Sequence, residues 1–260
     1  MMEIRTAVPG DLPAFAALWE LAFHDSPEVI RFVFEQFVHP ENVYLAEEDG
    51  ALLAILSAVP GQVGEDRGSY FYGLATQPQV QGRGIMTRLM DQVCALLGER
   101  GQKFVCLVPA SESLFGYYAQ RGFETAFYRL AGTYTGTDKP LPNFVAGPFR
   151  LGQKLAPVQF CFDPTYERAM IDSLGAVHIQ TQSGYGAFMP AGDKWFCLEL
   201  THPEVLDCAL AVCDVREIQL RCPALPALEG LGKKIPHGML RALDPEFAWE
   251  TLYLSLDGSL

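Results

Sequence analysis

The stretch LATQPQVQGRGIMT, residues 74–87, decides the fold. It joins an apolar run over residues 70–75 to a helical pattern in which Ile85, Leu89 and Val93 fall on one face. Glycines at positions 82 and 84 let the backbone of the connecting loop approach a ligand closely. A helix start leaves N–H groups unpaired and carries partial positive charge, so the pattern predicts a phosphate-binding loop between a strand and a helix.

Two familiar phosphate loops fit this stretch poorly. A P-loop requires Gly-Lys-Ser or Gly-Lys-Thr, and the loop contains no lysine. A dinucleotide-binding fingerprint requires a third glycine where Thr87 stands. On the loop alone, a plain turn between a strand and a helix remains open.

A second segment helps to decide whether the loop binds a phosphate or is a plain turn. Residues 103–109, KFVCLVP, have the β-branched and aromatic character of a strand. Ser111 is a candidate cap for a helix over residues 112–121, and Gly122 is placed to end it. That helix end reads Tyr118-Ala119-Gln120-Arg121-Gly122-Phe123. Taken by itself, Tyr118 is a packing aromatic as readily as a functional residue.

Together the two segments resemble the GNAT superfamily of acyl-CoA-dependent N-acyltransferases. The family's pyrophosphate loop has the pattern Gln/Arg-x-x-Gly-x-Gly/Ala, which matches from Gln81 through Ile85 and departs at Met86. Its second hallmark is Tyr-x-x-x-Gly-Phe, which begins here at Tyr118. The resemblance covers about residues 1–135. It implies acetyl-CoA as co-substrate and Tyr118 as the general acid that protonates the leaving thiolate.

The resemblance also assigns the other contacts. The backbone of Leu74 and Thr76 is expected to pair with the pantetheine amides. An amine acceptor is expected near the start of the second helix, although the residues there suit a cap or a plain surface as well. These acceptor candidates are Phe23, His24, Asp25 and Glu28. The expected acetyl-CoA contacts are Leu74, Ala75, Thr76, Gln81, Gly82, Arg83, Gly84, Ile85, Met86, Thr87 and Ser111.

The first half predicts an α/β (α+β) architecture: a GNAT fold with a mixed central sheet flanked by helices. Its predicted order is strand, two helices, three strands, helix, strand, helix and strand. Asp11 and Ser26 are candidate caps for the first two helices, and the Asp49-Gly50 pair predicts a hairpin. We therefore expect a GNAT acetyl-CoA-binding catalytic domain over residues 1–135.

Residues 136–260 predict a second, degenerate GNAT-like domain. Helices are expected over residues 164–174 and 203–212. Strands are expected at 177–180, 185–189, 195–200, 218–221, 239–242 and 251–254. Only Thr201-His202-Pro203 join strand to helix there, without a glycine, so this copy is expected not to bind CoA. The tandem arrangement resembles the Eis-type acetyltransferases, but the chain is too short for their additional sterol-carrier-like domain.

Composition limits the partners. The net charge of −12 disfavours nucleic acid and suits a cationic amine, or serves solubility alone. No apolar run reaches the ~18 residues of a membrane span, and the N-terminus lacks the layout of a signal peptide. Seven cysteines without a Cys-x-x-Cys motif predict reduced, mostly buried thiols in a cytoplasmic protein. The five histidines show no ligand spacing, so no metal is expected. The oligomeric state stays open.

These features predict an acetyl-CoA-dependent N-acetyltransferase that modifies a primary amine of a small molecule or peptide by direct attack in a ternary complex. Two other classes remain. One is a non-catalytic acyl-CoA sensor, which Met86 favours if its side chain narrows the site. The other is an interaction module that uses the fold without a ligand.

Overall fold

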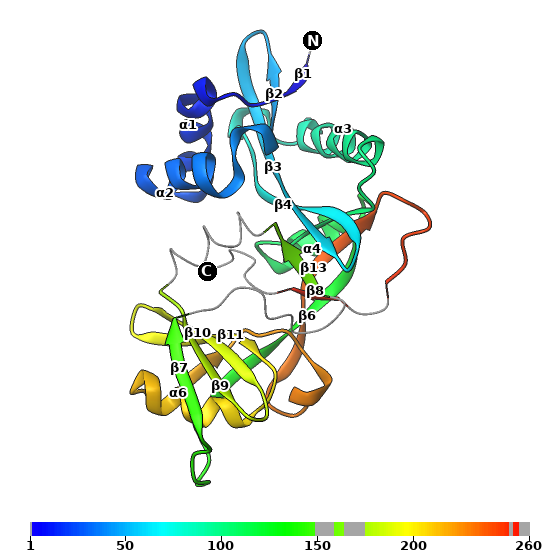
Figure 1. Cartoon of the computed structure of the whole chain (residues 1–260). Coiled ribbons are helices and arrows are strands. Elements are labelled where there is room, and N and C mark those ends of the chain that lie inside the picture. Colours follow the sequence, from blue (N-terminus) through cyan, green and yellow to red (C-terminus); the bar gives the residue numbers. More distant parts are fainter. Residues whose placement is uncertain (1, 149–158, 164–174, 250–251, 255–260) are drawn as a thin grey trace. The chain divides into compact units, whose positions relative to one another are not determined.

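The computed structural model describes residues 2–148, 159–163, 175–249 and 252–254 (Figure 1). The chain divides into two compact units. Unit 1 comprises Met1–Leu107, Ser111–Glu124 and Leu240–Ala248. Unit 2 comprises Val108–Ala110, Thr125–Met239 and Trp249–Leu260. The boundary at residues 135/136 between functional domains stays a prediction.

Unit 1 follows the predicted order of strands and helices. Its elements are β1 (Glu3–Thr6), α1 (Leu12–Phe23), α2 (Pro27–Phe32), β2 (Val43–Glu48), β3 (Ala51–Val63), β4 (Asp66–Thr76), α3 (Ile85–Glu99), β5 (Phe104–Leu107) and α4 (Glu112–Ala119). Short turns of other helix types lie at Pro9–Asp11, Val33–Val38, Pro40–Asn42 and Pro78–Val80. β6 (Glu124–Tyr134) then leads into unit 2.

The sheet of unit 1 is mixed, as the sequence predicts. β1, β2, β3 and β4 pair antiparallel in that order, and β5 pairs parallel to β4. The β2–β3 hairpin turns at Asp49 and Gly50, which both have positive φ angles of 51° and 78°. This is the geometry that an Asp-Gly pair favours, because both central residues of such a turn need φ > 0.

The two faces of this sheet are covered by different helices. Tyr72 of β4 packs against Trp19 of α1, with ring centroids 5.7 Å apart, and against Phe37 at 5.2 Å. Phe71, the next residue back along the strand, lies 6.4 Å from Phe123. Side chains alternate between the faces of a strand. Hence α1 and α2 cover one face, and α3 covers the other (Figure 1).

Three helix details differ from the sequence prediction. The Asp11 carboxylate accepts from Val8 N–H and pairs with Arg5, so it does not cap α1. Ser26 does accept from Val29 N–H, but α2 ends at Phe32 and continues as a wider turn. α4 ends at Ala119, two residues before the predicted end at 121, because the chain turns through residues 120–122 to reach a positive φ of 78° at Gly122.

Unit 2 repeats the strand–helix–strand pattern of unit 1. Its sheet has the order β7-β9-β10-β11-β12-β6. α6 joins β11 to β12, which pair in parallel, as α3 joins β4 to β5. The elements are β7 (Phe144–Pro148), β8 (Gln159–Phe162), β9 (Val177–Thr181), β10 (Tyr185–Ala191), β11 (Lys194–Leu200), α6 (Glu204–Cys213), β12 (Ile218–Leu220), β13 (Lys233–Ala242) and β14 (Tyr253–Leu254).

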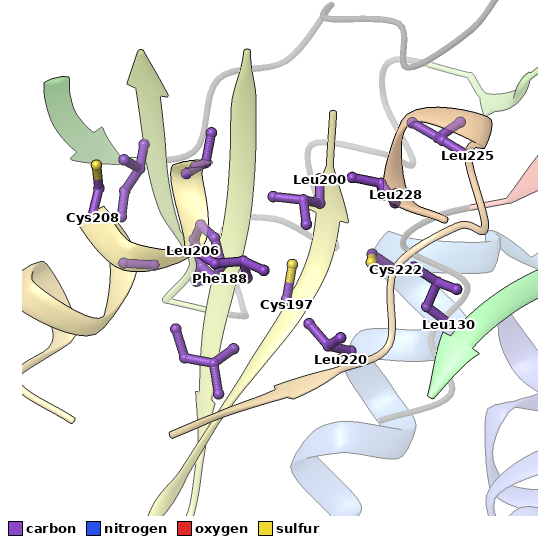
Figure 2. Packing of buried hydrophobic residues seen from close by; sticks show 14 of the residues in the cluster. Leu130, Phe188, Cys197, Leu200, Leu206, Cys208, Leu220, Cys222, Leu225 and Leu228 are labelled. Carbon is purple, nitrogen blue, oxygen red and sulfur yellow. The ribbon is translucent and has the colours of Figure 1, made fainter. Parts of the chain in front are cut away.

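The core of unit 2 lies between α6 and this sheet (Figure 2). Leu206 of α6 packs in one cluster with Phe188, Leu200 and Leu220 of the strands, and each is nearly or fully buried. Each such side chain contributes about 1.5–3 kcal/mol by leaving water. Five of the seven cysteines are buried: Cys94, Cys106, Cys197, Cys208 and Cys222.

Most predicted elements of the second half are present. The helix predicted over residues 164–174 lies outside the described residues, and so does residue 251 of the last predicted strand. β7 and β8 were not predicted, and β13 begins six residues before the predicted start at 239. Gly147 and Pro148 weaken the strand pattern of β7, and β8 is only four residues long.

Residues 240–248 return to unit 1. Leu243 N–H donates to the Lys103 carbonyl at 2.8 Å, and Lys103 forms an ion pair with Asp244. Arg241 pairs with Asp91 of α3 at 2.9 Å, and Phe247 stacks on Phe104 with ring centroids 4.7 Å apart. Unit 1 is therefore completed by a segment more than 100 residues downstream.

Candidate active site

β4 carries a bulge just before the predicted pantetheine contacts. Its register with β3 shifts between Ile55 and Ser57, and Gly73 has φ of 61°. A Cβ atom at Gly73 would lie 2.1 Å from Cζ3 of Trp19. Only glycine therefore fits this bulge, and the strand bends where Leu74 begins its last three residues.

The edge of β4 that faces β5 is open beyond the bulge. The parallel ladder joins Gly68–Tyr70 to Phe104–Cys106, while β4 continues to Thr76. Among the described residues, no strand pairs with this edge past Tyr70. Ala75 is buried, and Leu74 and Thr76 are half-buried. An extended ligand with amide groups can pair with such an edge as an added strand does.

The glycine-spaced loop closes the gap between β4 and α3. Pro78–Val80 form a single turn, after which the Gln81 side chain donates to the Thr76 carbonyl at 3.2 Å. Gly82 and Gly84 have φ of 78° and 73°, and a Cβ at either would meet nothing within 4 Å. The glycines are thus needed for backbone conformation, and the space beside them is empty of protein.

The backbone of residues 82–87 presents its N–H groups without protein acceptors. Within the described chain, none of these amides donates to a protein group, and the first turn of α3 contains no acidic residue. Ile85 is buried, while Met86 and Thr87 are half-buried. Arg83 is 56% exposed and pairs loosely with Glu48 at 3.7 Å. This arrangement of free N–H groups at a helix start suits an anion, and the loop is called the anion cradle below.

Tyr118 is held in a fixed position near the end of α4. Its carbonyl accepts from the N–H groups of Arg121 at 2.9 Å and Phe123 at 3.2 Å. Its ring is 8% exposed and packs edge-to-face against Tyr117 and Phe123. Burial raises the pKa of Tyr118 to about 12, which nearby Tyr117 reinforces and the Arg121 charge opposes. The phenol keeps its proton at neutral pH and is therefore able to donate a hydrogen bond.

Ser111 stands at the N-cap position of α4, but it does not cap the helix. Its hydroxyl lies 2.9 Å from the Ser113 hydroxyl. Ser111 is exposed. Its predicted contact with acetyl-CoA stays a prediction.

The acceptor candidates divide into two groups. Asp25 accepts a 2.8 Å hydrogen bond from Trp19 Nε1, and Phe23 packs on the same indole with ring centroids 4.6 Å apart. Because Trp19 touches Gly73, these two residues connect to the bulge of β4. His24 and Glu28 are exposed at the helix ends. The pKa of Glu28 is lowered by its own backbone N–H and by Ser26, as at an ordinary helix start.

Trp19, Gly73 and Arg121 belong to the site but were not among the predicted residues. Arg121 donates to Thr87 in the first turn of α3 and so joins the two motifs. A lone glycine inside a strand pattern is a recognised sign of a bulge, and Gly73 carried that signal. No local sequence signal marks Trp19 as a neighbour of that bulge.

Two kinds of site are not found in the part of the chain described. None of its helices is long and apolar enough to cross a membrane. Its His, Cys, Asp and Glu side chains form no group of three or more that could hold a metal ion.

Comparisons with known proteins agree with this geometry. A family model described as an acetyltransferase (GNAT) domain matches residues 3–126. A search of curated proteins finds no match. A GCN5-related N-acetyltransferase from Kribbella flavida has a TM-score of 0.68 and 15% identity, over 94% of this chain and 72% of its own. Eis1 from Mycobacterium abscessus has a TM-score of 0.68 and 14% identity, over 94% and 74%.

A GCN5-related N-acetyltransferase from Anabaena variabilis gives the same result, with a TM-score of 0.69 and 16% identity over 94% and 73% of the two chains. At such identities the likeness concerns the fold, and it extends well beyond the matched residues into the second half. The anion cradle, the bulged strand and the Tyr118 helix all lie within residues 3–126. The part of the chain that matches the acetyltransferase (GNAT) domain model is therefore the part that carries the candidate site.

Proposed function

We propose that this protein is an acetyl-CoA-dependent N-acetyltransferase that acetylates a primary amine of a small molecule or peptide within a ternary complex. The cradle of unpaired N–H groups at residues 82–87, beside the open edge of β4, carries the proposal. A pyrophosphate and a pantetheine arm are the two chemical groups that such neighbouring features would bind.

The proposed binding mode uses the backbone above all. The pyrophosphate would accept from the amides of residues 82–87, with Gln81 closing the loop behind it. The pantetheine amides would pair with Leu74 and Thr76, and Ala75 would face the core. Ser111 would complete the cofactor contacts at the start of α4.

In the proposed reaction, a neutral amine attacks the thioester carbonyl, a C–N bond forms and the C–S bond breaks. A free alkyl ammonium has a pKa of ~10.4, so it must first lose a proton to a base, which is a carboxylate, a histidine or a water chain. The CoA thiolate leaves and takes a proton or a hydrogen bond from Tyr118. The phenol, with a pKa of about 12, is a weak acid. Full proton transfer from the phenol to the CoA thiolate would be favourable only if the site also raised the pKa of the CoA thiol toward that of Tyr118.

The acceptor would approach from the α1–α2 side of β4. Asp25 accepts from Trp19 with one carboxylate oxygen, and Phe23 is 38% exposed beside the same ring. A carboxylate and aromatic faces together suit a cationic amine. His24 and Glu28 would act from the surface. The net charge of −12 would raise the local concentration of such an acceptor.

We assign catalysis to the domain over residues 1–135 and propose that the domain over 136–260 binds no CoA. The linker from β11 to α6 is three residues long, and His202 Nδ1 already accepts from Glu204 N–H at 3.3 Å. The first turn of α6 also carries Glu204 and Asp207. These carboxylates would repel a phosphate at the helix end where α3 attracts one.

A second candidate is an acyl-CoA sensor without turnover. Met86 is half-buried in the first turn of α3, where the GNAT pattern has glycine or alanine. A side chain there would crowd the pyrophosphate and could leave a bound acyl-CoA poorly aligned for attack.

One experiment separates the two candidates. Acetyl-CoA binding is measured by calorimetry, and CoA release is then followed with a thiol reagent over polyamines, aminoglycosides, amino acids and peptides. We expect binding and amine-dependent thiol release. Binding without release from any amine would favour the sensor, and no binding would refute both candidates.

A further inference from the structure

Arg121 bridges the two motifs of unit 1. Its Nε–H donates to the Thr87 hydroxyl oxygen at 2.9 Å, and another guanidinium N–H donates to the Tyr117 carbonyl at 2.6 Å. The guanidinium carbon lies 3.5 Å from the centroid of the Tyr117 ring. The side chain therefore folds back along α4 and ends at the first turn of α3, with three separate contacts fixing its plane.

The bond to Thr87 has a consequence for the cradle. A hydroxyl has one proton to donate, and its oxygen can accept at the same time. Because Arg121 supplies a donor to that oxygen, the Thr87 proton is left for another acceptor. Thr87 is the third residue of α3, in the turn whose backbone N–H groups lack protein acceptors. An anion at this turn is thus offered one more donor.

Arg121 also adds a full positive charge beside the half-charge of the helix end. The guanidinium is already held by its contacts with Thr87 and Tyr117, so little further freedom is lost when an anion binds beside it. At the other end of the same bridge, Arg121 follows Tyr118 by three residues. Its backbone N–H donates to the Tyr118 carbonyl.

We infer that Arg121 is a positioning residue that orients the Thr87 hydroxyl toward the CoA pyrophosphate and holds the Tyr118 helix end against that same turn. This inference rests on the proposed function of the site. It adds a specific coupling, because about half of the contribution of Arg121 to the free energy of CoA binding should pass through Thr87.

A double-mutant cycle measures that coupling. CoA affinity is determined by calorimetry for the wild type, Thr87→Val, Arg121→Met and the double variant. We expect Arg121→Met to weaken CoA binding about tenfold when Thr87 is present. In the Thr87→Val background, it should weaken binding only about threefold, which is the share due to charge alone.

Arg88→Met is the matched control, because it removes an arginine from the next position of α3, and the hydrogen bonds of the described residues include none between the Arg88 side chain and the Thr87 hydroxyl. Arg88→Met should change CoA affinity by the same factor in the wild-type and the Thr87→Val proteins. Thr87→Ser keeps the hydroxyl and should keep wild-type affinity, whereas Thr87→Val should lose about tenfold. Equal binding by this pair would overturn the inference even if Arg121→Met fails to fold.

Two results would overturn the inference in different ways. If the wild type binds CoA and Arg121→Met has the same effect in both Thr87 backgrounds, or if Thr87→Ser and Thr87→Val bind alike, the inference is wrong and the proposed function stands. If the wild type binds no CoA, the proposed function fails and this inference fails with it.

Discussion

The backbone carbonyl of Tyr118 accepts hydrogen bonds from two later residues, and its ring packs against two aromatic neighbours. Tyr118→Phe retains this packing and removes only the hydroxyl. We expect kcat to fall by ~10–10³-fold with little change in acetyl-CoA affinity, because the donor acts on the leaving thiolate and not on the bound thioester. Steady-state kinetics with an acceptor from the amine panel measures this.

The adjacent Tyr117 provides the control. Tyr117→Phe keeps the ring that lies under Arg121 and should leave kcat within about twofold of wild type. If Tyr118→Phe turned over at the wild-type rate, the hydroxyl would have no part in the chemistry.

The raised pKa of Tyr118 makes a prediction at alkaline pH. Its pKa rises from the ordinary 10.0 to about 12 because of burial. The neutral phenol is therefore favoured in the folded state, and its contribution to stability is complete below pH 10 and is lost as the pH rises through about 12. At pH 11 such a phenol is still roughly 90% protonated, against roughly 10% for an ordinary tyrosine.

For the free enzyme, kcat/KM expressed per neutral amine should therefore stay within about twofold between pH 9 and pH 11. Circular dichroism at pH 11 must show that the protein is still folded. A tenfold loss in kcat/KM that is absent from Tyr118→Phe would mean that the pKa of Tyr118 is close to 10.

Gly73 tests the bulge of β4. Gly73→Ala places a methyl group 2.1 Å from the Trp19 ring at a φ of 61°. We expect a loss of about 2–4 kcal/mol in the free energy of unfolding, measured with urea, because strain and overlap act together. Gly50→Ala is the control: it has a φ of 78° and no atom within 4 Å, so it should lose only about 1 kcal/mol. Equal losses would show that Trp19 yields easily.

Among the elements, α3 and α6 occupy corresponding places in their units and differ at their N-termini. α3 follows a loop with two glycines at positive φ and has no acidic residue in its first turn. α6 follows a three-residue linker and has Glu204 and Asp207 there. Asp207 is already engaged by Tyr134 and Thr137. Under the proposed function, the same helix position binds an anion in one unit and serves packing in the other.

Gly84→Glu should make the N-terminus of α3 as unfavourable for an anion as that of α6. The substitution puts a side chain and a negative charge at the start of α3, so CoA affinity should fall at least about 100-fold by calorimetry. Gly64→Glu is the matched control, because Gly64 also has positive φ and open space but lies in the β3–β4 turn. A folded Gly84→Glu protein that binds CoA as the wild type does would refute the assignment of the loop.

The stoichiometry of binding tests the contrast between the two helices directly. Calorimetric titration should give one CoA per chain, because the first amides of α6 already donate to His202 and Pro203, whereas those at the start of α3 have no protein acceptor among the described residues. The reverse charge change, Glu204→Gln with Asp207→Asn, should not create a second site, since the linker before α6 remains short and His202 still binds the first turn. Two CoA molecules per wild-type chain would contradict the degenerate second domain.

At the scale of the whole chain, the sequence predicted the parts whose signals are local. The glycine spacing of the loop, the Asp-Gly hairpin and the apolar faces of α1 and α3 each depend on neighbouring residues, and they appear as expected. The strand–helix–strand pattern of the second half was visible for the same reason.

What the sequence did not predict depends on residues far apart in the chain. The Thr87–Arg121 bond joins residues 34 positions apart, and the Trp19–Gly73 contact joins two elements that look independent in sequence. β7 is short and contains Gly147 and Pro148, so its pairing with β9 had no clear local signal. The return of residues 240–248 to unit 1 likewise had no local signal in the sequence.

That return bears on how the protein is made. During synthesis the N-terminal part of a chain emerges first and generally begins to fold first. Yet the partners of Lys103 and Asp91 stand 141 and 150 residues later, at Asp244 and Arg241. The ribosome must therefore release nearly the whole chain before unit 1 acquires its last contacts. Until then Phe104 lacks the ring of Phe247 that stacks on it in the complete chain, and exposed apolar surface of this kind is what chaperones bind during synthesis.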